Sequence, residues 1–345
     1  MQNKNYISSY IAGTGKCVPE KIISNSYFES YLETSDQWIT ERTGIKERRW
    51  TDDNVGITEL AQIASEQAIQ RSNLEVSAID GIIFGTVTPD FHLPSAACIL
   101  QTKLGITRGF AFDVTAACAG FIYSLALADM YIARGVAKNV LVVGGDLVSY
   151  LANQQDRNTC VLFGDGVGAV VVRACEKDAE QAGNFKLVDL KSTPGIYASE
   201  LCADGREADI LKIPYGSANR LTPELVAAGG HFVQMDGKAV FKFAVKALVE
   251  VTQTICAQVG LKISEIDHFV SHQANQRILQ LVGEQLGLDK SKIPMNIEKY
   301  GNTSAGTVPV LLDEELEAGR IKRGDLVLFS AIGSGMVWGA VLVRI

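Results

Sequence analysis

The sequence predicts an α/β protein built from two similar halves. Three observations carry this prediction: a helix–loop–strand unit occurs twice, continuous apolar runs alternate with stretches of helical periodicity, and 345 residues suit about two units of ordinary domain size. Continuous apolar runs are typical of strands that helices cover on both faces. We therefore expect helices to cover a sheet in each half, and a ligand site between the halves.

The first repeated unit is a helix followed by a short loop and a strand. Residues 57–71 and 240–259 have apolar residues at helical spacing, which predicts the two helices. The loops and strands that follow them, Ser77–Phe84 and Ser264–Val270, lie 187 positions apart. The unit therefore predicts one helix packed on one strand in each half.

Two further pairs of apolar strands follow in the same order. Val140–Gly144 and Leu326–Ser330 lie 186 positions apart, and Gly168–Arg173 and Gly339–Arg344 lie 171 positions apart. Three matches in one order indicate a duplication.

The duplication predicts one half over residues 1–183 and the other over residues 184–345. Residues 194–230 match nothing in the first half and are rich in glycine and proline. We expect an inserted loop region there, and loops of this length are often functional.

Composition excludes several classes of protein. The chain carries 32 Lys and Arg against 39 Asp and Glu, a net charge of −7, whereas a nucleic-acid-binding protein normally has a basic excess. The N-terminus lacks the pattern of an export signal, and no run of about 18 apolar residues predicts a membrane span. Seven scattered cysteines without a Cys-x-x-Cys pair predict neither a disulfide framework nor a zinc cluster, and they suit a reducing cytoplasm.

One cysteine lies at a predicted helix start. Phe112–Gly120 joins an apolar strand to a helix, and Cys118 falls at the junction between small neighbours. Backbone N–H groups and the positive end of the helix dipole favour a thiolate there, and small neighbours leave room for a substrate. A cysteine with small neighbours is also a common core residue, so both interpretations remain open at this point.

His272 and Asn302 favour the functional interpretation. His272 follows the strand 266–271 at its C-terminal end, where α/β folds place reactive groups. Asn302 lies 184 positions after Cys118, close to the repeat spacing, so we expect it at the symmetry-related helix start. Either residue alone has an ordinary alternative, a structural histidine or a helix N-cap. Two helix starts that meet across a pseudo-twofold axis would bring all three residues into one cleft.

A glycine-rich loop follows the strand at 326–331. Gly333–Gly335 turns tightly enough to aim a backbone N–H into the same cleft as an oxyanion donor, although a plain turn is the alternative.

These segments resemble the 3-oxoacyl-(acyl carrier protein) synthase III family, condensing enzymes of the thiolase-fold superfamily. The resemblance covers nearly the whole chain and is carried by Asp113–Phe121, Ser271–Arg277, Gly301–Gly306, Ser35–Ile45, Phe163–Gly166 and Trp338–Gly339. It implies a thiolase-like fold, in which two duplicated α/β halves form a five-layered αβαβα body.

The resemblance also implies a role for individual residues. It makes Cys118 the acyl-accepting nucleophile, His272 and Asn302 the decarboxylation pair, and the N–H groups of Cys118 and Ser334 the oxyanion hole. The remaining roles are coenzyme A binding by Trp38, Arg42, Arg157 and Asn275, carrier-protein docking by Lys242 and Arg277, and closure of the partner subunit's acyl pocket by Leu93.

The implied reaction is the first condensation of type II fatty acid synthesis. An acyl group passes from acyl-CoA to Cys118 and is then joined to malonyl-acyl carrier protein with loss of CO₂, giving a 3-oxoacyl-acyl carrier protein. No metal or cofactor is expected, because decarboxylation itself supplies the carbanion. The implied protein is a cytoplasmic homodimer whose partners are acyl-CoA, malonyl-acyl carrier protein and the carrier protein.

An alternative is a related starter enzyme of polyketide or quinolone-type secondary metabolism, which would share the triad. The complete His272–Asn275 stretch and Arg277 favour fatty acid initiation. One departure concerns docking, because Glu284 and Gln285 stand where the family often has lysines. Against it, Lys238, Lys242 and Lys246 recur every four residues and predict a basic helix face near Arg277, for which a solvated surface is the alternative.

Overall fold

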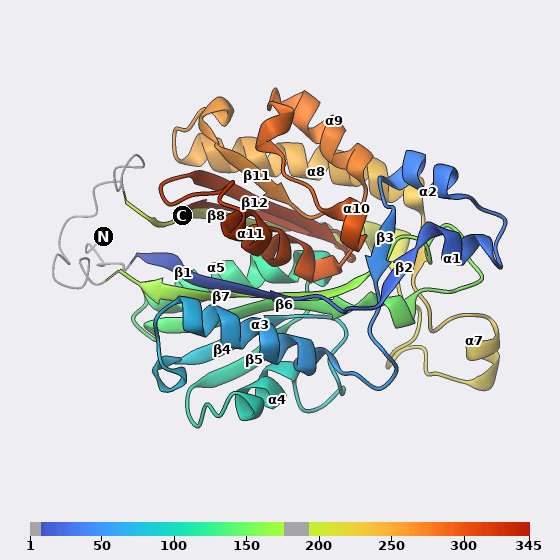
Figure 1. Ribbon diagram of the computed structural model, residues 1–345, viewed down its shortest axis with the longest axis horizontal. Coiled ribbons are helices and arrows are strands. Elements are labelled where there is room, and N and C mark those ends of the chain that lie inside the picture. Colours follow the sequence, from blue (N-terminus) through green and yellow to red (C-terminus); the bar gives the residue numbers. More distant parts are fainter. Residues whose placement is uncertain (1–7, 176–192) are drawn as a thin grey trace.

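The computed structural model describes residues 8–175 and 193–345. Within them the chain forms five alternating layers of helices and sheets (Figure 1). This confirms the predicted αβαβα arrangement. The predicted boundary between residues 183 and 184 lies outside the described residues.

The first sheet has five strands in the described part of the chain. In spatial order they are β1 (Ser9–Cys17), β7 (Asp165–Ala174), β6 (Asn139–Leu147), β4 (Gly81–Gly85) and β5 (Phe110–Val114). β1, β7 and β6 pair antiparallel, whereas β6, β4 and β5 run parallel. β5 therefore forms one edge of this sheet.

The second sheet repeats the order of the first four strands. Its described strands in spatial order are β8 (Gly195–Ala203), β13 (Val337–Arg344), β12 (Leu326–Gly333) and β11 (His268–Ser271). β8 occupies the place of β1 and pairs antiparallel with β13. The expectation of a loop over residues 194–230 is therefore wrong for Gly195–Ala203, which forms the edge strand of the sheet.

The strand registers correct the spacing of the repeat. Gly81 pairs with Val140 in the first sheet, and His268 pairs with Val327 in the second, so both pairs are 187 positions apart. The same spacing relates two hydrogen bonds from a backbone N–H to an aspartate: Asp80 accepts from Asn139 N, and Asp267 accepts from Leu326 N. The spacing of 186 for the second match was thus wrong by one residue, because a run of similar apolar side chains does not fix register.

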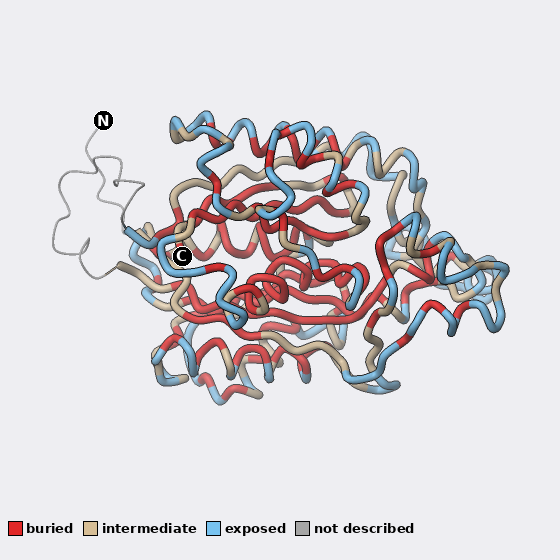
Figure 2. Tube along the Cα trace, turned by 45° about the horizontal axis from the view of Figure 1, so that its top comes forward, coloured by how far each residue is buried: buried red, intermediate tan, exposed pale blue. Residues whose placement is uncertain are grey.

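The helices lie in three layers. α3 (Ile57–Arg71) and α4 (Ala96–Lys103) cover the first sheet, and α8 (Gly237–Gln258) and α9 (Gln276–Leu286) cover the second. The central helices are α5 (Gly120–Ala133) and α11 (Thr307–Glu317). The central pair is buried on nearly all sides, whereas the outer helices expose polar faces, as Figure 2 shows.

Shorter elements gather beside the layers and carry several predicted site residues. They are β2 (Ile22–Ser24), α1 (Asn25–Glu29), α2 (Asp36–Thr43), β3 (Glu47–Arg49), β9 (Leu211–Lys212), α7 (Pro223–Ala227), β10 (Gln234–Met235) and α10 (Ile297–Tyr300). A fully buried Arg48 donates to Ile23 O and Val161 O and so ties β2 and β3 to the loop before β7. None of the helices in the described residues has the length and apolar character needed to cross a lipid bilayer.

Candidate active site

Cys118 lies in a tight turn between the end of β5 and the start of α5. The turn is the short 3₁₀ helix η2 (Ala117–Ala119), and Ala117 adopts the left-handed backbone conformation with φ of 45°. Glycines allow this turn to press against the sheet: a Cβ on Gly85 would lie only 2.3 Å from the backbone carbon of Gly120. Strained non-glycine residues of this kind often mark functional sites.

The protonation state of Cys118 differs from the sequence-based expectation. Burial raises the pKa of its thiol to about 12. A hydrogen bond from Ser304 Oγ to Sγ, 3.3 Å long, and the backbone N–H lower the pKa, whereas the charge of Asp146 raises it further. The expected thiolate is therefore wrong for the resting protein, because removal from water outweighs the favourable N–H groups at the helix start.

His272 follows β11 directly and is 4% exposed. Its backbone N–H donates to Ser330 O, and its Nδ1 lies 3.3 Å from Thr307 Oγ1. Burial lowers the pKa of the imidazole to about 4. His272 is therefore neutral near pH 7 and has one N–H donor and one acceptor nitrogen.

Asn302 reaches the same region from the segment before the second 3₁₀ turn, η7 (Ser304–Gly306). Its backbone bridges to Phe163, with Asn302 N donating to Leu162 O. Its Oδ1 accepts from Ser304 N at 2.9 Å, which leaves the amide nitrogen as the donor end of the side chain.

The expectation that Asn302 occupies the helix start related to that of Cys118 is wrong. At the spacing of 187 that the strands establish, η2 corresponds to η7, and Cys118 corresponds to Ala305. Asn302 lies three residues earlier and enters the site through its pairing with the Phe163 segment.

The loop after β12 lies against the cysteine turn. A Cβ on Gly333 would lie 2.7 Å from Cys118 N, so only glycine permits this approach. The next residue, Ser334, donates from Oγ to Leu211 O, and its side chain is therefore turned toward β9. The backbone of the loop borders the cysteine, where an oxyanion donor is expected.

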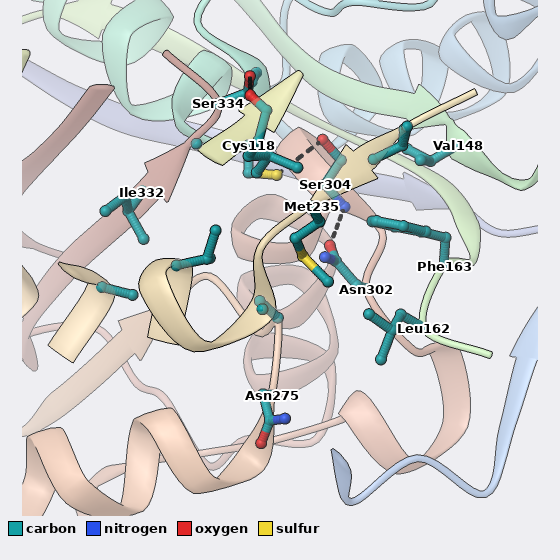
Figure 3. Close-up of a pocket in the computed structure, with 18 of the residues that line it drawn as sticks. Cys118, Val148, Leu162, Phe163, Met235, Asn275, Asn302, Ser304, Ile332 and Ser334 are labelled. Atoms are coloured by element: carbon teal, nitrogen blue, oxygen red, sulfur yellow. Dashed lines mark hydrogen bonds between the residues drawn. The ribbon is translucent and has the colours of Figure 1, made fainter. Parts of the chain in front are cut away.

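One cavity of about 1230 Å³ joins these residues. Cys118, His272, Asn302, Ser334 and Ser304 all line it. Figure 3 shows Ser304 between Cys118 and Asn302, joined to each by a hydrogen bond. Apolar side chains surround this group, among them Val148, Leu162, Phe163, Met235 and Ile332. The cavity thus combines a sulfur nucleophile, neutral polar donors and apolar walls.

The residues expected to bind coenzyme A line the same cavity. Arg42 and Arg157 both stack on Trp38, with guanidinium carbons 4.4 and 5.2 Å from a ring centroid. Arg157 also donates to Glu33 O. An adenine ring stacked between the Trp38 ring and the Arg157 guanidinium needs a separation of about 7 Å between these two groups, because each stacking contact takes about 3.5 Å. The implied sandwich therefore requires the exposed Arg157 side chain to move outward.

Asn275 also lines the cavity, but its side chain already has two partners. Its Oδ1 caps α9 by accepting from Arg277 N, and its Nδ2 donates to Arg42 O at 2.9 Å. Asn275 therefore ties the start of α9 to α2. In Figure 3 it lies well away from Cys118.

The residues expected to dock the carrier protein divide between two places. Arg277 lines the cavity together with Lys238. Lys242 lies on the exposed side of α8, where it borders a separate groove of about 510 Å³ with Lys246 and Gln285.

Leu93 does not line the cavity of its own chain. Its side chain is 87% exposed, in the loop before α4. In the single chain it therefore contacts mainly solvent.

Ser304 contacts Cys118 across 186 positions and is not among the site residues that the sequence predicted. The repeat held the necessary signal, because the correct spacing of 187 aligns Ser304 with Ala117 in the cysteine turn. Ser304 also shares the left-handed conformation of Ala117, with φ of 51°. In the described residues no group of three or more His, Cys, Asp or Glu is arranged to hold a metal ion.

Comparison with known proteins connects this geometry to a family. Residues 112–190 match the family model described as 3-oxoacyl-[acyl-carrier-protein] synthase III, and residues 256–345 match the model of its C-terminal part. The beta-ketoacyl-[acyl-carrier-protein] synthase III of Natranaerobius thermophilus is 42% identical over 97% of this chain and 98% of its own length.

Two solved structures have the same fold. The 3-oxoacyl-[acyl-carrier-protein] synthase III of Aquifex aeolicus superposes with a TM-score of 0.86 at 39% identity, covering 98% of this chain and 100% of the other. The priming beta-ketosynthase of the R1128 polyketide pathway gives a TM-score of 0.88 at 27% identity, covering 100% and 98%. These matches confirm the predicted thiolase-like fold.

Proposed function

The chain belongs to the 3-oxoacyl-[acyl-carrier-protein] synthase III family, and from this premise we propose that Cys118, His272 and Asn302 carry out its reaction. The protein is a condensing acyltransferase that initiates type II fatty acid synthesis. Similarity to the polyketide priming enzyme is lower, at 27% identity against 42%, which favours the fatty acid role over the secondary-metabolic alternative.

The observation that best supports the residue roles is the shared cavity. Cys118 comes from the first half and His272 and Asn302 from the second, yet all three line one space with apolar walls. That space, about 1230 Å³, exceeds an ordinary small-ligand pocket and suits a long thioester substrate.

Acylation uses the sulfur of Cys118. As Sγ bonds to the thioester carbon of acyl-CoA, its proton must leave, and the neutral His272 in the same cavity is a suitable acceptor. The carbonyl oxygen gains negative charge, which the N–H groups of Cys118 and Ser334 bind. The bond to the coenzyme A sulfur then breaks, that sulfur takes the proton back from His272 and leaves as the thiol, and the acyl group stays on Sγ.

Condensation uses the donors of the second half. Malonyl-acyl carrier protein enters the cavity and loses CO₂, and the electron pair of the broken bond forms an enolate on the thioester. Asn302 offers its amide N–H, because its oxygen is held by Ser304 N. The N–H of the neutral His272 ring forms the second donor. The enolate carbon attacks the acyl carbon, the bond to Sγ breaks, and Sγ leaves as a thiolate that then takes up a proton from water.

Coenzyme A and the carrier protein are the proposed partners at the mouth of the site. Trp38, Arg42, Arg157 and Asn275 would hold the coenzyme. Arg277 and Lys242 would supply positive charge for an acidic carrier protein, although the chain as a whole has a net charge of −7.

A homodimer is proposed from the edge of the first sheet. All five residues of β5 are only partly buried, although they pair with the fully buried β4. Phe110 and Phe112 form a ring cluster with Tyr131 on this edge, with centroids 4.7 Å apart for Phe110 and Tyr131. An open edge strand beside exposed apolar side chains suits a second copy of the chain. Leu93 would then reach the partner's acyl pocket. Seven free cysteines support a cytoplasmic location.

Intact-protein mass spectrometry tests the proposed nucleophile. The wild-type protein incubated with a panel of acyl-CoAs should gain the mass of the acyl group, and the Cys118→Ala protein should not. Cys98→Ala is the matched control, because Cys98 is also partly buried but contacts Ala111 O outside the cavity. An acyl adduct on Cys118→Ala would refute the assignment.

A further inference from the structure

The two equivalent 3₁₀ turns, η2 and η7, pack against each other, but the residues that surround them differ. Ala117 and Ser304 are equivalent residues, and both have positive φ values. At the same spacing of 187, Asp146 at the end of β6 corresponds to Gly333 at the end of β12. The neighbouring strand therefore places an aspartate beside the second-half turn and a glycine beside the cysteine turn.

In the second-half turn, a carboxylate binds the backbone. Asp146 Oδ2 accepts from Ala305 N at 3.3 Å, and Ala305 is the equivalent of Cys118. In the first-half turn, Gly333 has no side chain, and a Cβ there would lie 2.7 Å from Cys118 N. Among the described residues, no side chain on β12 binds the N–H of Cys118, whereas the equivalent N–H of Ala305 donates to Asp146.

Asp146 is held in place by donors from the first half. Its Oδ1 accepts from Thr86 Oγ1 at 2.9 Å, from Val87 N at 2.7 Å and from Thr88 Oγ1 at 3.2 Å. The residue is fully buried. A carboxyl group fixed in this way gives the second-half turn a rigid support.

Ser304 is the residue that this support places on the sulfur. Its backbone N–H donates to Asn302 Oδ1 at 2.9 Å, and the next N–H donates to Asp146. Its hydroxyl donates to Cys118 Sγ at 3.3 Å. Burial raises the pKa of the Asp146 carboxyl, and a hydrogen bond with Ser304 partly offsets this rise.

We propose that Ser304 is a positioning residue for the nucleophile: supported by Asp146 and Asn302, its hydroxyl orients Sγ of Cys118 and donates to the thiolate formed during acylation. The inference rests on the proposed role of Cys118. A hydroxyl donor becomes stronger when the sulfur is charged, so the bond contributes most after the proton has left. Asp146 acts in two opposed ways, because it supports Ser304 but its charge disfavours a second negative charge nearby.

The ionisable groups around the cysteine turn are few. His272 lines the same cavity, and Asp146 lies behind Ser304. Of the elements packed on the turn, β12 and η7 carry no ionisable side chain. The ionisable side chains on α5 and β13 have partners elsewhere: Tyr123 with Cys202 O, Asp129 with Ser9, Tyr131 with Phe110 and Arg344 with Gly324 O. A change in thiol acidity should therefore report on Ser304, Asp146 or His272.

The test measures the rate of Cys118 alkylation by iodoacetamide between pH 7 and pH 10, by mass spectrometry of the proteolytic peptide that contains Cys118, because the other free cysteines gain the same mass. Ser304→Ala should slow alkylation about tenfold at each pH, the loss expected for one hydrogen bond to a charged group. Asp146→Asn should speed it, because the substitution removes the negative charge. The new amide can place its NH₂ group against Ala305 N–H, where two donors repel each other. Thermal unfolding is therefore measured alongside, to show that the variant is folded.

Ser9→Ala is the matched control. Ser9 is likewise buried and donates to a carboxylate, that of Asp129, but neither residue lines the cavity. Its alkylation rate should equal that of the wild type. Equal alkylation rates of Cys118 in Ser304→Ala and wild type, with no such alkylated peptide from Cys118→Ala, would overturn the role of Ser304. They would leave the proposed role of Cys118 intact. Acylation of Cys118→Ala by acyl-CoA would instead overturn the proposed nucleophile.

Discussion

The contact between Gly333 and the cysteine turn leads to the sharpest prediction, which concerns Gly333→Ala. The added Cβ would lie 2.7 Å from Cys118 N, 2.9 Å from Ala116 O and 3.0 Å from Ala117 Cβ. Ordinary contacts are about 3.5 Å, so the loop or the turn must move by about 0.8 Å. Oxyanion donors act only within a few tenths of an ångström of their best position, so this shift should disable the hole.

The expected loss is that of one oxyanion donor, about 10² to 10³-fold in the acylation rate, or about 2.7 to 4 kcal/mol of transition-state stabilisation. The assay follows acyl-enzyme formation in a single turnover by quenched-flow mass spectrometry. Thermal unfolding of the same sample shows whether the protein is folded.

Two control variants separate the loss of the oxyanion donor from the general effect of a substitution on the acylation rate. Ser334→Ala removes the side-chain bond to Leu211 O but keeps the backbone N–H, so its rate should change by about twofold. Gly205→Ala adds the same methyl group where no atom lies within 4 Å. If folded Gly333→Ala acylated as fast as these controls, the backbone of this loop would have no part in stabilising the oxyanion.

Four further predictions follow from the site. Asn302→Ala should still accept an acyl group but should lose condensation by about 10²-fold or more, because it removes an enolate donor; condensation at the wild-type rate in a malonyl decarboxylation assay would contradict this role. Burial lowers the pKa of His272 to about 4 from an ordinary value of 6.5, so the unfolded chain binds a proton in this range that the folded chain does not. Stability should therefore fall as the pH decreases from 6.5 toward 4, by up to about 3 kcal/mol, and urea unfolding of a His272→Asn variant should lack this part of the slope; parallel pH profiles would argue against it. Lys242→Glu should weaken use of malonyl-acyl carrier protein more than use of acyl-CoA and flatten the salt dependence, and equal effects on both substrates would exclude a docking role. Leu93→Phe should reduce use of branched or four-carbon acyl-CoAs while sparing acetyl-CoA, since each excluded methylene removes about 0.8 kcal/mol of binding; an unchanged preference in an intact dimer would show that Leu93 does not close the pocket.

Much of the fold was predictable because its pattern is local. Helical spacing over residues 57–71 predicted α3 with its observed bounds, and continuous apolar runs predicted the buried strands of both sheets. β8 was missed, because Gly195–Ala203 mixes small, polar and apolar residues and follows a proline. Only its place opposite β1 in the duplicated order identifies it as a strand.

The sequence by itself determined the duplication and the identity of Cys118, His272 and Asn302 as candidate residues, because strand ends and helix starts are visible in the order of residue types. It did not determine protonation. The same helix start that favours a thiolate lies in a buried turn, and only the surrounding atoms decide that desolvation prevails.

Tertiary structure alone decided the contacts that join the halves. Ser304 and Cys118 are 186 positions apart, and their hydrogen bond depends on the packing of two turns against two sheets. Asp146 and Gly333 are equivalent residues in the two halves, but Asp146 presents a carboxylate to Ala305 N, whereas Gly333 has no side chain and lies close to Cys118 N. A sequence pattern shows which side chains alternate along a strand. The distance between two strand ends is set by how the layers pack. This distance determines which backbone N–H group is bound by a neighbouring side chain.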